Sequence, residues 1–226
     1  MKKILISLLI ICFLILTIFK VKANIAQFPL IGKTIIIDSG HGGKDSGTIS
    51  NNIEEKNINL EITYKLKEQL EQKGAVVLLT RTTDSDLSNP SSSRRKKSDF
   101  DNRIAIINNS NANIYLSIHQ NNYSNSKYYG PQVFYTTKNS KNEQLAQTIQ
   151  KNLNNLSKTN RKIKITTNTY MYNKLNIPGV LIECGFLSNP NELQKLTNKT
   201  YQKELSISIT NALIDYFNWY FIIFSY

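Results

Sequence analysis

Three apolar runs in this chain each end in a side chain that can bind a metal ion or transfer a proton. The runs read TIIID-SGH, IYLSIH and GVLIE, and they end at His41, His119 and Glu183. Runs that are apolar at every position are typical of strands buried on both faces, as in a parallel sheet covered by helices. Ligands of such sheets bind at the carboxyl ends of the strands. The sequence therefore predicts that the three endings meet at one edge of a sheet.

Helical segments separate the apolar runs, which predicts an α/β fold of three layers, with helices on both faces of a mostly parallel sheet. The spacing of Ile58, Ile62, Leu66 and Leu70 predicts a helix over 54–73 that stops at Gly74. Further helices are predicted over 99–109, 140–156, 189–196 and 199–217. Strands are predicted over 34–38, 75–80, 113–119, 131–136 and 178–185. The polar segment 82–99 is predicted to be a loop.

The first 24 residues have the pattern of a targeting segment. Lys2 and Lys3 precede a largely apolar stretch, and Val21-Lys22-Ala23 resembles a small-residue cleavage site. The stretch is a little shorter than the ~20 residues that span a bilayer. We therefore expect residues 1–24 to be a signal peptide or an N-terminal membrane anchor, and residues 25–226 to form one exported domain. Cys184 is the only cysteine of that domain, so it has no intramolecular disulfide.

The charge of the chain favours an anionic partner. The 28 basic and 16 acidic residues give +12, and without the four lysines of residues 1–24 the balance is 24 against 16, or +8. A cell wall, an anionic membrane surface or nucleic acid would suit this charge. The basic cluster at 94–97 is not accompanied by a recognition helix, a zinc-finger spacing or an RNA-binding motif, so nucleic acid is not expected. We interpret the cluster as a solvated loop.

Two histidines and several carboxylates at one edge of a sheet indicate a metal site. A catalytic zinc ion commonly has three protein ligands, and imidazole is a preferred one. The chain has only two histidines, His41 and His119, so the third ligand must be a carboxylate. Glu54 and Glu55 are both candidates, and Glu183 fits the role of general base.

Other interpretations of the same residues are weaker. Each histidine on its own could be a hydrogen-bonded residue at the sheet edge. The run GHGGKDSG matches neither the phosphate-binding P-loop nor the dinucleotide pattern, so we interpret its glycines as a tight turn that directs His41 to the site. Cys184 is disfavoured as a nucleophile because strand neighbours face opposite sides, and no spacing supports Ser39.

Three motifs in order resemble the zinc-dependent N-acetylmuramoyl-L-alanine amidases. They read IIIDSGHGGKDSG followed by EEKNINLEI, then YLSIHQNN, and then PGVLIECGFLSNPNE. The resemblance covers nearly all of residues 33–217, and it implies a twisted six-stranded sheet flanked by helices. It also implies a peptidoglycan hydrolase that cleaves the amide bond between N-acetylmuramic acid and L-alanine.

The resemblance also assigns roles to residues. It implies that Zn²⁺ is bound by His41, Glu55 and His119, with Glu55 preferred to Glu54 because a lysine follows it. It implies that Glu183 is the catalytic residue. Candidates for orienting the ligands or contacting the substrate are Asp38, Asp45 and Asn121. A loop-capping role for the two aspartates is equally compatible with the sequence.

Segment 91–109 and the single short domain look most like the germination-specific, spore-cortex type of this family, in which muramic-δ-lactam forms. The alternatives are a vegetative or cell-separation amidase, a non-catalytic peptidoglycan-binding module, and a zinc carboxypeptidase or endopeptidase. Peptidoglycan is the implied partner, and some members need an activating protein. We expect membrane contact only through the N-terminal segment, although the C-terminal WYFIIF either completes a core helix or touches membrane. The expected location is the cell wall or the extracytoplasmic membrane face, including the space between forespore and mother cell.

Overall fold

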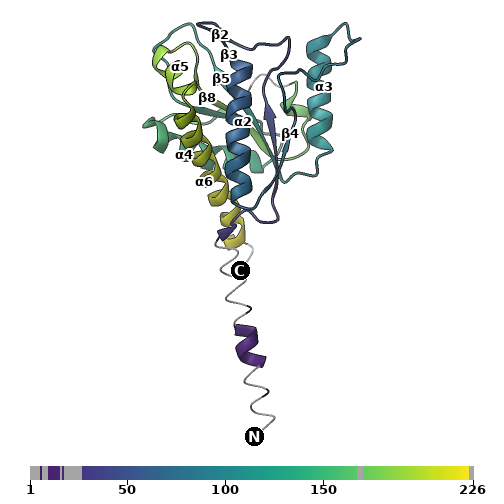
Figure 1. Ribbon diagram of the computed structural model, residues 1–226, viewed down its shortest axis with the longest axis vertical. Coiled ribbons are helices and arrows are strands. Elements are labelled where there is room, and N and C mark those ends of the chain that lie inside the picture. The colour runs from purple at the N-terminus through teal and green to yellow at the C-terminus, as the bar shows by residue number, and fades with distance from the viewer. Residues whose placement is uncertain (1–5, 7–9, 16, 18–26, 167–169, 224–226) are drawn as a thin grey trace.

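The computed structural model describes residues 6, 10–15, 17, 27–166 and 170–223 of the chain, without the side chains of 219–223 (Figure 1). Most of the predicted leader lies outside the described residues, and so do the side chains of the aromatic C-terminus. Among the described residues, no helix combines the length and the apolar character needed to cross a membrane.

Six strands form the main sheet. Their order across it is β4 (Val76–Leu79), β1 (Thr34–Ser39), β5 (Ile114–Asn121), β8 (Gly179–Phe186), β6 (Gln132–Tyr135) and β7 (Lys164–Ile165). Neighbouring strands are parallel, except that β6 runs antiparallel to β8. This confirms the predicted six-stranded, mostly parallel α/β sheet. The short edge strand β7 was not predicted, because two exposed residues carry no apolar pattern.

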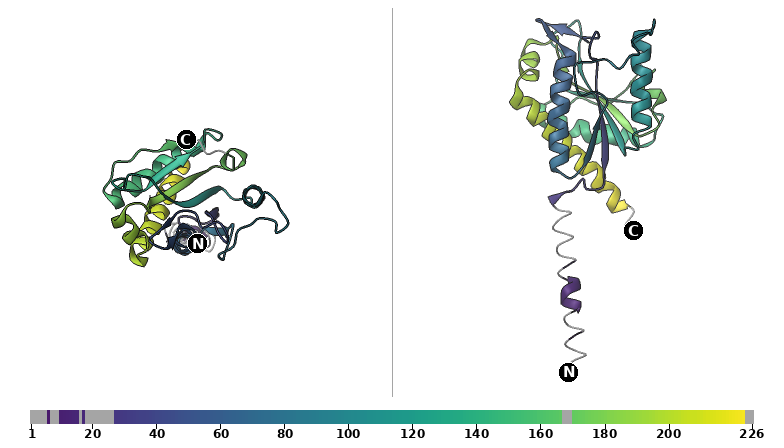
Figure 2. Two further views of the ribbon diagram at one scale, coloured as in Figure 1. Left: turned by 90° about the horizontal axis from the view of Figure 1, so that it is seen from above. Right: turned by 45° about the vertical axis from the view of Figure 1, so that its right-hand side comes forward.

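Helices cover both faces of the sheet, as predicted (Figure 2). The longer ones are α2 (Glu55–Gln72), α3 (Arg95–Asn108), α4 (Lys141–Ser157) and α6 (Lys199–Ile223), and the short ones are α5 (Pro190–Leu196) and the 3₁₀ turn η1 (Tyr172–Lys174). Helices α2, α4 and α6 pack on one face in the larger apolar cluster. Helix α3 and η1 pack on the other face in a smaller cluster.

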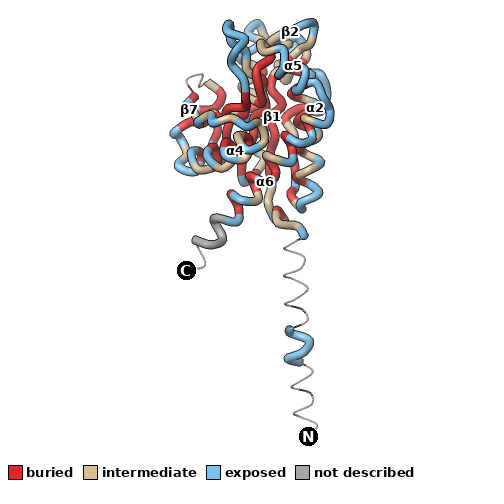
Figure 3. Tube along the Cα trace, turned by 90° about the vertical axis from the view of Figure 1, so that its left-hand side faces the viewer, coloured by how far each residue is buried: buried red, intermediate tan, exposed pale blue. Residues whose placement is uncertain are grey.

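Strand β1 explains why the runs are apolar throughout. Ile35 and Ile37 belong to the larger cluster, whereas Ile36 between them belongs to the smaller one. Alternate side chains of a strand point to opposite faces, so a strand covered on both sides needs an apolar residue at every position. Figure 3 shows the result as a continuous buried interior along the central strands. Each fully buried isoleucine contributes about 1.5–3 kcal/mol of transfer free energy.

Helix α3 begins four residues earlier than predicted, so the loop interpretation of the basic cluster is wrong for Arg95–Lys97. The residue before the helix, Arg94, makes no side-chain capping bond, and the usual sequence signal for a helix start is therefore missing. Ion pairs stabilise the first turn instead: Arg95 Nη1 lies 2.6 Å from Asp86, and Lys97 Nζ lies 2.5 Å from Asp101.

A two-stranded hairpin that the sequence did not predict leads into α2. Strands β2 (Ile49–Ser50) and β3 (Ile53–Glu54) pair antiparallel around Asn51 and Asn52. Both asparagines have positive φ angles, of 49° and 64°, as the favoured two-residue hairpin turn requires. Because β3 ends at Glu54 and α2 begins at Glu55, the hairpin fixes where the first turn of α2 lies.

Candidate metal centre

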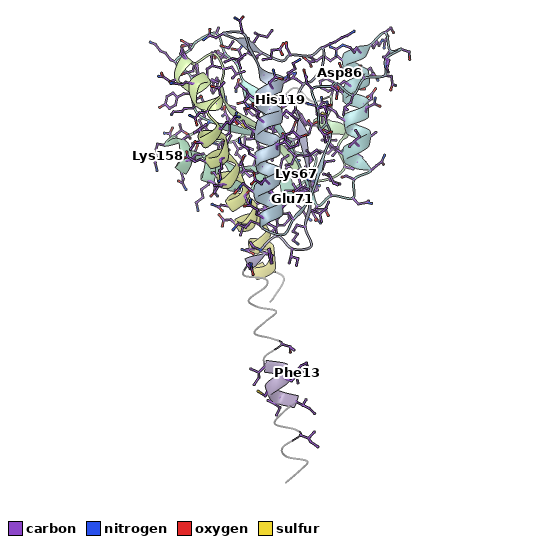
Figure 4. The ribbon with its side chains drawn as sticks, viewed as in Figure 1. Phe13, Lys67, Glu71, Asp86, His119 and Lys158 are labelled. Atoms are coloured by element: carbon purple, nitrogen blue, oxygen red, sulfur yellow. The ribbon has the colours of Figure 1, made fainter. Side chains whose placement is uncertain are left out.

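Three predicted ligands converge at the carboxyl end of the sheet. His41 follows β1, His119 lies near the end of β5, and Glu55 opens α2. One potential ligand atom from each residue lies within 4.8 Å of those of the other two. Figure 4 labels His119 close to the upper part of α2. The structure therefore brings His41, Glu55 and His119 together from three separate parts of the chain, and we call these three residues the metal group.

The spacing of these atoms fits a single metal ion. Glu55 Oε1 lies 3.2 Å from His41 Nε2 and 3.1 Å from His119 Nδ1. Ligands about 2.0–2.1 Å from a tetrahedral zinc ion stand roughly 3.3 Å apart, so both glutamate–histidine distances already match, and the three atoms together lie within 4.8 Å of one another. Two imidazole nitrogens and one carboxylate oxygen are also a donor set found in catalytic zinc sites.

Glu55, and not Glu54, faces the histidines. Glu55 is only 3% exposed, and its Oε1 accepts a hydrogen bond from the Gln120 backbone N–H at 3.1 Å. Its Oε2 accepts one from the Thr48 N–H at 2.9 Å. Glu54 instead pairs with Lys56 Nζ at 3.2 Å. Although burial opposes ionisation, the bonds to the two histidines hold the pKa of Glu55 well below its usual range, so it is a carboxylate.

Asp45, a predicted orienting residue, lies against the outer nitrogen of the first histidine. Its Oδ2 is 3.0 Å from His41 Nδ1. A carboxylate there keeps the proton on Nδ1 and leaves Nε2 facing Glu55, the tautomer that a metal ligand needs. Without a metal ion, burial disfavours the charged ring, yet the bonds to Asp45 and Glu55 raise the pKa of His41 to about 9, so a metal ion must displace the Nε2 proton to use this tautomer. Asp45 thus has the geometry of a supporting residue.

Glu183 stands next to His119 across two parallel strands. The two residues are aligned partners in the β5–β8 register, and both line a cavity of about 670 Å³. Oε2 of Glu183 is shielded from solvent and has no hydrogen-bond partner among the described residues. Burial, with a smaller contribution from the charge of Glu55, raises the pKa of Glu183 to about 7. Such a carboxyl group can both accept and release a proton near neutral pH.

The cavity continues from the metal group towards α3 and η1. Its far wall is formed by Lys96, Phe100, Met171, Tyr172 and Leu181. Asn121 is not among the described residues that line it, so the structure does not bring this predicted substrate contact to the cavity. Cys184 is fully buried in the larger core cluster on the opposite face, as its alternation with Glu183 predicted.

Beneath the metal group lies a buried polar network that the sequence predicted only in part. Asp38 was predicted, and its carboxylate accepts hydrogen bonds from Thr80, Ser117 and Arg103 at 2.7–2.8 Å. Arg103 was missed. The one available signal was Asp99 four residues before it, a helical spacing for an ion pair. Such pairs normally lie on exposed faces, so the spacing does not indicate burial.

Gly40 carries a testable consequence of this packing. A Cβ atom on Gly40 would lie 2.2 Å from His119 Nε2. Its φ angle is not in the left-handed region, so alanine there is strained by contact alone. We expect Gly40→Ala to displace the His119 ring and weaken the binding of a divalent metal such as zinc at least about tenfold, the lower range for a disturbed ligand environment.

Chelator competition on the purified protein would measure that affinity. Gly32→Ala is the matched control. Gly32 has a φ of 73°, but no atom lies within 4 Å of the position that an alanine methyl group would take, so the change adds backbone strain without touching the site. Unchanged zinc affinity in Gly40→Ala would mean that the ring of His119 is free to move without loss.

Comparison with known proteins agrees with the geometry of the site. A family model described as N-acetylmuramoyl-L-alanine amidase matches residues 35–215. The germination-specific N-acetylmuramoyl-L-alanine amidase of Bacillus subtilis is 40% identical over 195 residues, which cover 84% of this chain and 82% of that protein.

Solved structures give the same result. The CwlD amidase of Clostridioides difficile, in complex with the GerS lipoprotein, aligns with a TM-score of 0.79 and 42% identity over 83% of this chain and 99% of its own. An N-acetylmuramoyl-L-alanine amidase from Clostridium difficile 630 aligns with a TM-score of 0.73 and 34% identity, over 82% and 97% of the two chains. The resemblance seen in the three sequence motifs is confirmed, and the chain belongs to the N-acetylmuramoyl-L-alanine amidase family.

Proposed function

We propose that this protein cleaves the amide bond between N-acetylmuramic acid and L-alanine in spore-cortex peptidoglycan, with zinc held by His41, Glu55 and His119. The observation that carries the proposal is the unpartnered, shielded Oε2 of Glu183 beside these three residues. A peptidoglycan-binding module without chemistry would have no use for such a group. The cortex assignment is supported by the 40% identity to the germination-specific relative.

Each residue of the site has a defined task in this hydrolysis. A bound zinc ion supplies Lewis-acid chemistry, since it polarises the amide carbonyl and makes water more acidic. Glu183 Oε2 takes the proton from the attacking water and delivers it to the departing amine nitrogen of L-alanine. Asp45 holds the His41 ring in the required tautomer. Phe100 and Tyr172 line the same cavity and would flank a bound substrate.

Product analysis tests this function. Zinc-loaded protein is incubated with purified cortex and vegetative peptidoglycan, and the soluble products are identified by mass spectrometry. We expect stem peptides with a free L-alanine amino group to be released faster from cortex, and to leave uncut glycan strands with a free lactyl carboxylate. Cuts within the stem peptide would identify a carboxypeptidase or an endopeptidase. Equal rates of release from both substrates would support the amidase activity but contradict a preference for cortex peptidoglycan.

Location and partners form the remaining part of the proposal. Residues 1–24 act as a signal peptide or membrane anchor, and residues 25–226 form the catalytic domain at the cell wall or the extracytoplasmic membrane face, including the space between forespore and mother cell. The complex of the Clostridioides difficile amidase with the GerS lipoprotein supports a protein partner for this chain, and we propose that this partner activates it. Full activity of the isolated zinc-loaded protein would make such a partner unnecessary.

A further inference from the structure

Two buried arginines hold the loop that carries the first histidine. Three consecutive backbone carbonyls, of Ser39, Gly40 and His41, accept hydrogen bonds from guanidinium groups. Arg81 binds the first two, with Nε 2.9 Å from Ser39 O and Nη2 3.0 Å from Gly40 O. Arg103 binds the first and third, with Nη1 2.8 Å from Ser39 O and Nη2 2.7 Å from His41 O. Of the two arginines, therefore, Arg103 is the one that contacts the backbone of the histidine itself.

Arg103 is itself fixed by two carboxylates. It is 2% exposed, with Nε 2.8 Å from Asp99 Oδ2 and Nη1 2.7 Å from Asp38 Oδ1. The second oxygen of Asp38 accepts a hydrogen bond at 2.7 Å from Ser117, which lies two residues before His119 on β5. Charge-assisted bonds of this length are strong and directional. The network thus joins α3 to both strands that supply histidines.

The backbone of His41 needs this support. Its φ angle is 61°, in the left-handed region, which few residues with a side chain adopt and which the surrounding structure has to support. Gly40 and Gly42 on either side offer little resistance to rotation. Asp45 holds the His41 ring at 3.0 Å, but a contact with the ring does not fix the position of the His41 backbone carbonyl. The hydrogen bond from Arg103 Nη2 to that carbonyl fixes it.

We propose that Arg103 is a positioning residue that holds the His41 backbone in its left-handed conformation and thereby pre-organises the metal-binding group. This rests on the zinc ligands assigned under the proposed function. A metal site whose ligands are held in place binds the ion without a further ordering cost, and loss of a supporting bond typically lowers metal affinity about 10–100-fold. A purely structural role would lower stability and leave zinc affinity unchanged.

Arg103→Lys separates these two roles. Lysine keeps one positive charge near Asp38 and Asp99, so the two buried carboxylates still share a counter-charge. A single ammonium group cannot reach both carboxylates and the His41 carbonyl at once, because it lacks the planar fork of arginine. We expect the full-length variant to fold and to bind zinc about 10–100-fold more weakly than wild type. Chelator competition measures this directly and requires no peptidoglycan.

Two controls show whether the loss is specific. Arg161→Lys alters another arginine that binds backbone, through its Nε to the Tyr129 carbonyl at 2.5 Å, away from the metal group. Ile149→Val lowers stability in the core packing of α4, on the face opposite α3. Both variants should keep wild-type zinc affinity even where their melting temperatures fall as far as that of Arg103→Lys.

The outcomes distinguish this inference from the proposed function. If wild-type protein binds no zinc, the assignment of the ligands fails. If wild type binds zinc and Arg103→Lys binds it equally well, the ligands stand and the positioning role is overturned. If the two controls lose zinc affinity as well, general destabilisation explains the loss in Arg103→Lys, and the proposal is again overturned. A loss confined to Arg103→Lys supports it, as would recovery of activity in this variant at excess zinc.

Discussion

Replacing Glu183 with glutamine is expected to lower kcat by about 10²–10⁴-fold, the range attributed to general acid–base catalysis, while zinc content stays at the wild-type level. The amide has nearly the shape of the carboxyl group but cannot take a proton from water. Glu183 makes no hydrogen bond through Oε2 to a described residue, so the substitution breaks no contact there. Rates of peptide release from peptidoglycan and metal analysis of the same preparation measure both quantities.

Cys184→Ala is the control on the same strand. Cys184 is buried in the core on the other face, so its truncation should lower the melting temperature slightly and leave activity intact. If Glu183→Gln turned over at the wild-type rate, Glu183 would not be the proton-transfer group. If Cys184→Ala were inactive, disturbance of β8 alone would explain the loss, and the test would not single out Glu183.

In the metal-free protein, the difference in stability between wild type and Glu183→Gln should also depend on pH. Burial raises the pKa of Glu183 from 4.5 to about 7, so the folded state binds more protons than the unfolded state between these values. Wild-type stability therefore falls as pH rises through this window. Glutamine does not ionise, so the melting temperature of the variant minus that of wild type should increase from pH 4.5 to 7. A constant difference would contradict the raised pKa.

The central part of the fold could be predicted because burial on both faces leaves a direct mark on the sequence. Each inner strand is apolar at every position, and the ends of parallel strands meet at one edge whatever the connections between them. That reasoning placed His41, His119 and Glu183 together, and all three line one cavity. It needed no knowledge of side-chain contacts.

Features that depend on particular tertiary contacts could not be predicted in this way. Helix α3 starts with ion pairs to Asp86 and Asp101, and not with a capping residue. The strand pattern left Glu54 and Glu55 both open, and only the family resemblance favoured Glu55, because the choice depends on a hairpin whose strands are two residues long and show no periodicity. The burial of Arg103 follows from the two carboxylates that surround it, one of them 65 positions away in the chain.

Replacing His119 with alanine is expected to abolish stoichiometric zinc binding, and with it all amidase activity. His119 supplies one of the three clustered ligand atoms, and its Nδ1 lies 3.1 Å from Glu55 Oε1. With one of three protein ligands gone, the loss should exceed the roughly 10–100-fold typical of a disturbed supporting residue. Metal analysis after dialysis, followed by peptide release at increasing zinc concentrations, would measure the loss and whether excess metal restores activity.

Asn121→Ala provides the comparison within β5. Asn121 lies two residues further along the strand, and its backbone carbonyl accepts a hydrogen bond from the Leu187 N–H, which the substitution keeps. Because the described cavity wall does not include Asn121, the variant should retain both zinc and activity. A reduced kcat/KM with normal zinc content would restore its predicted contact with substrate. Stoichiometric zinc in His119→Ala would remove His119 from the ligands, and because only one other histidine exists in the chain, the proposed two-histidine site would then be untenable.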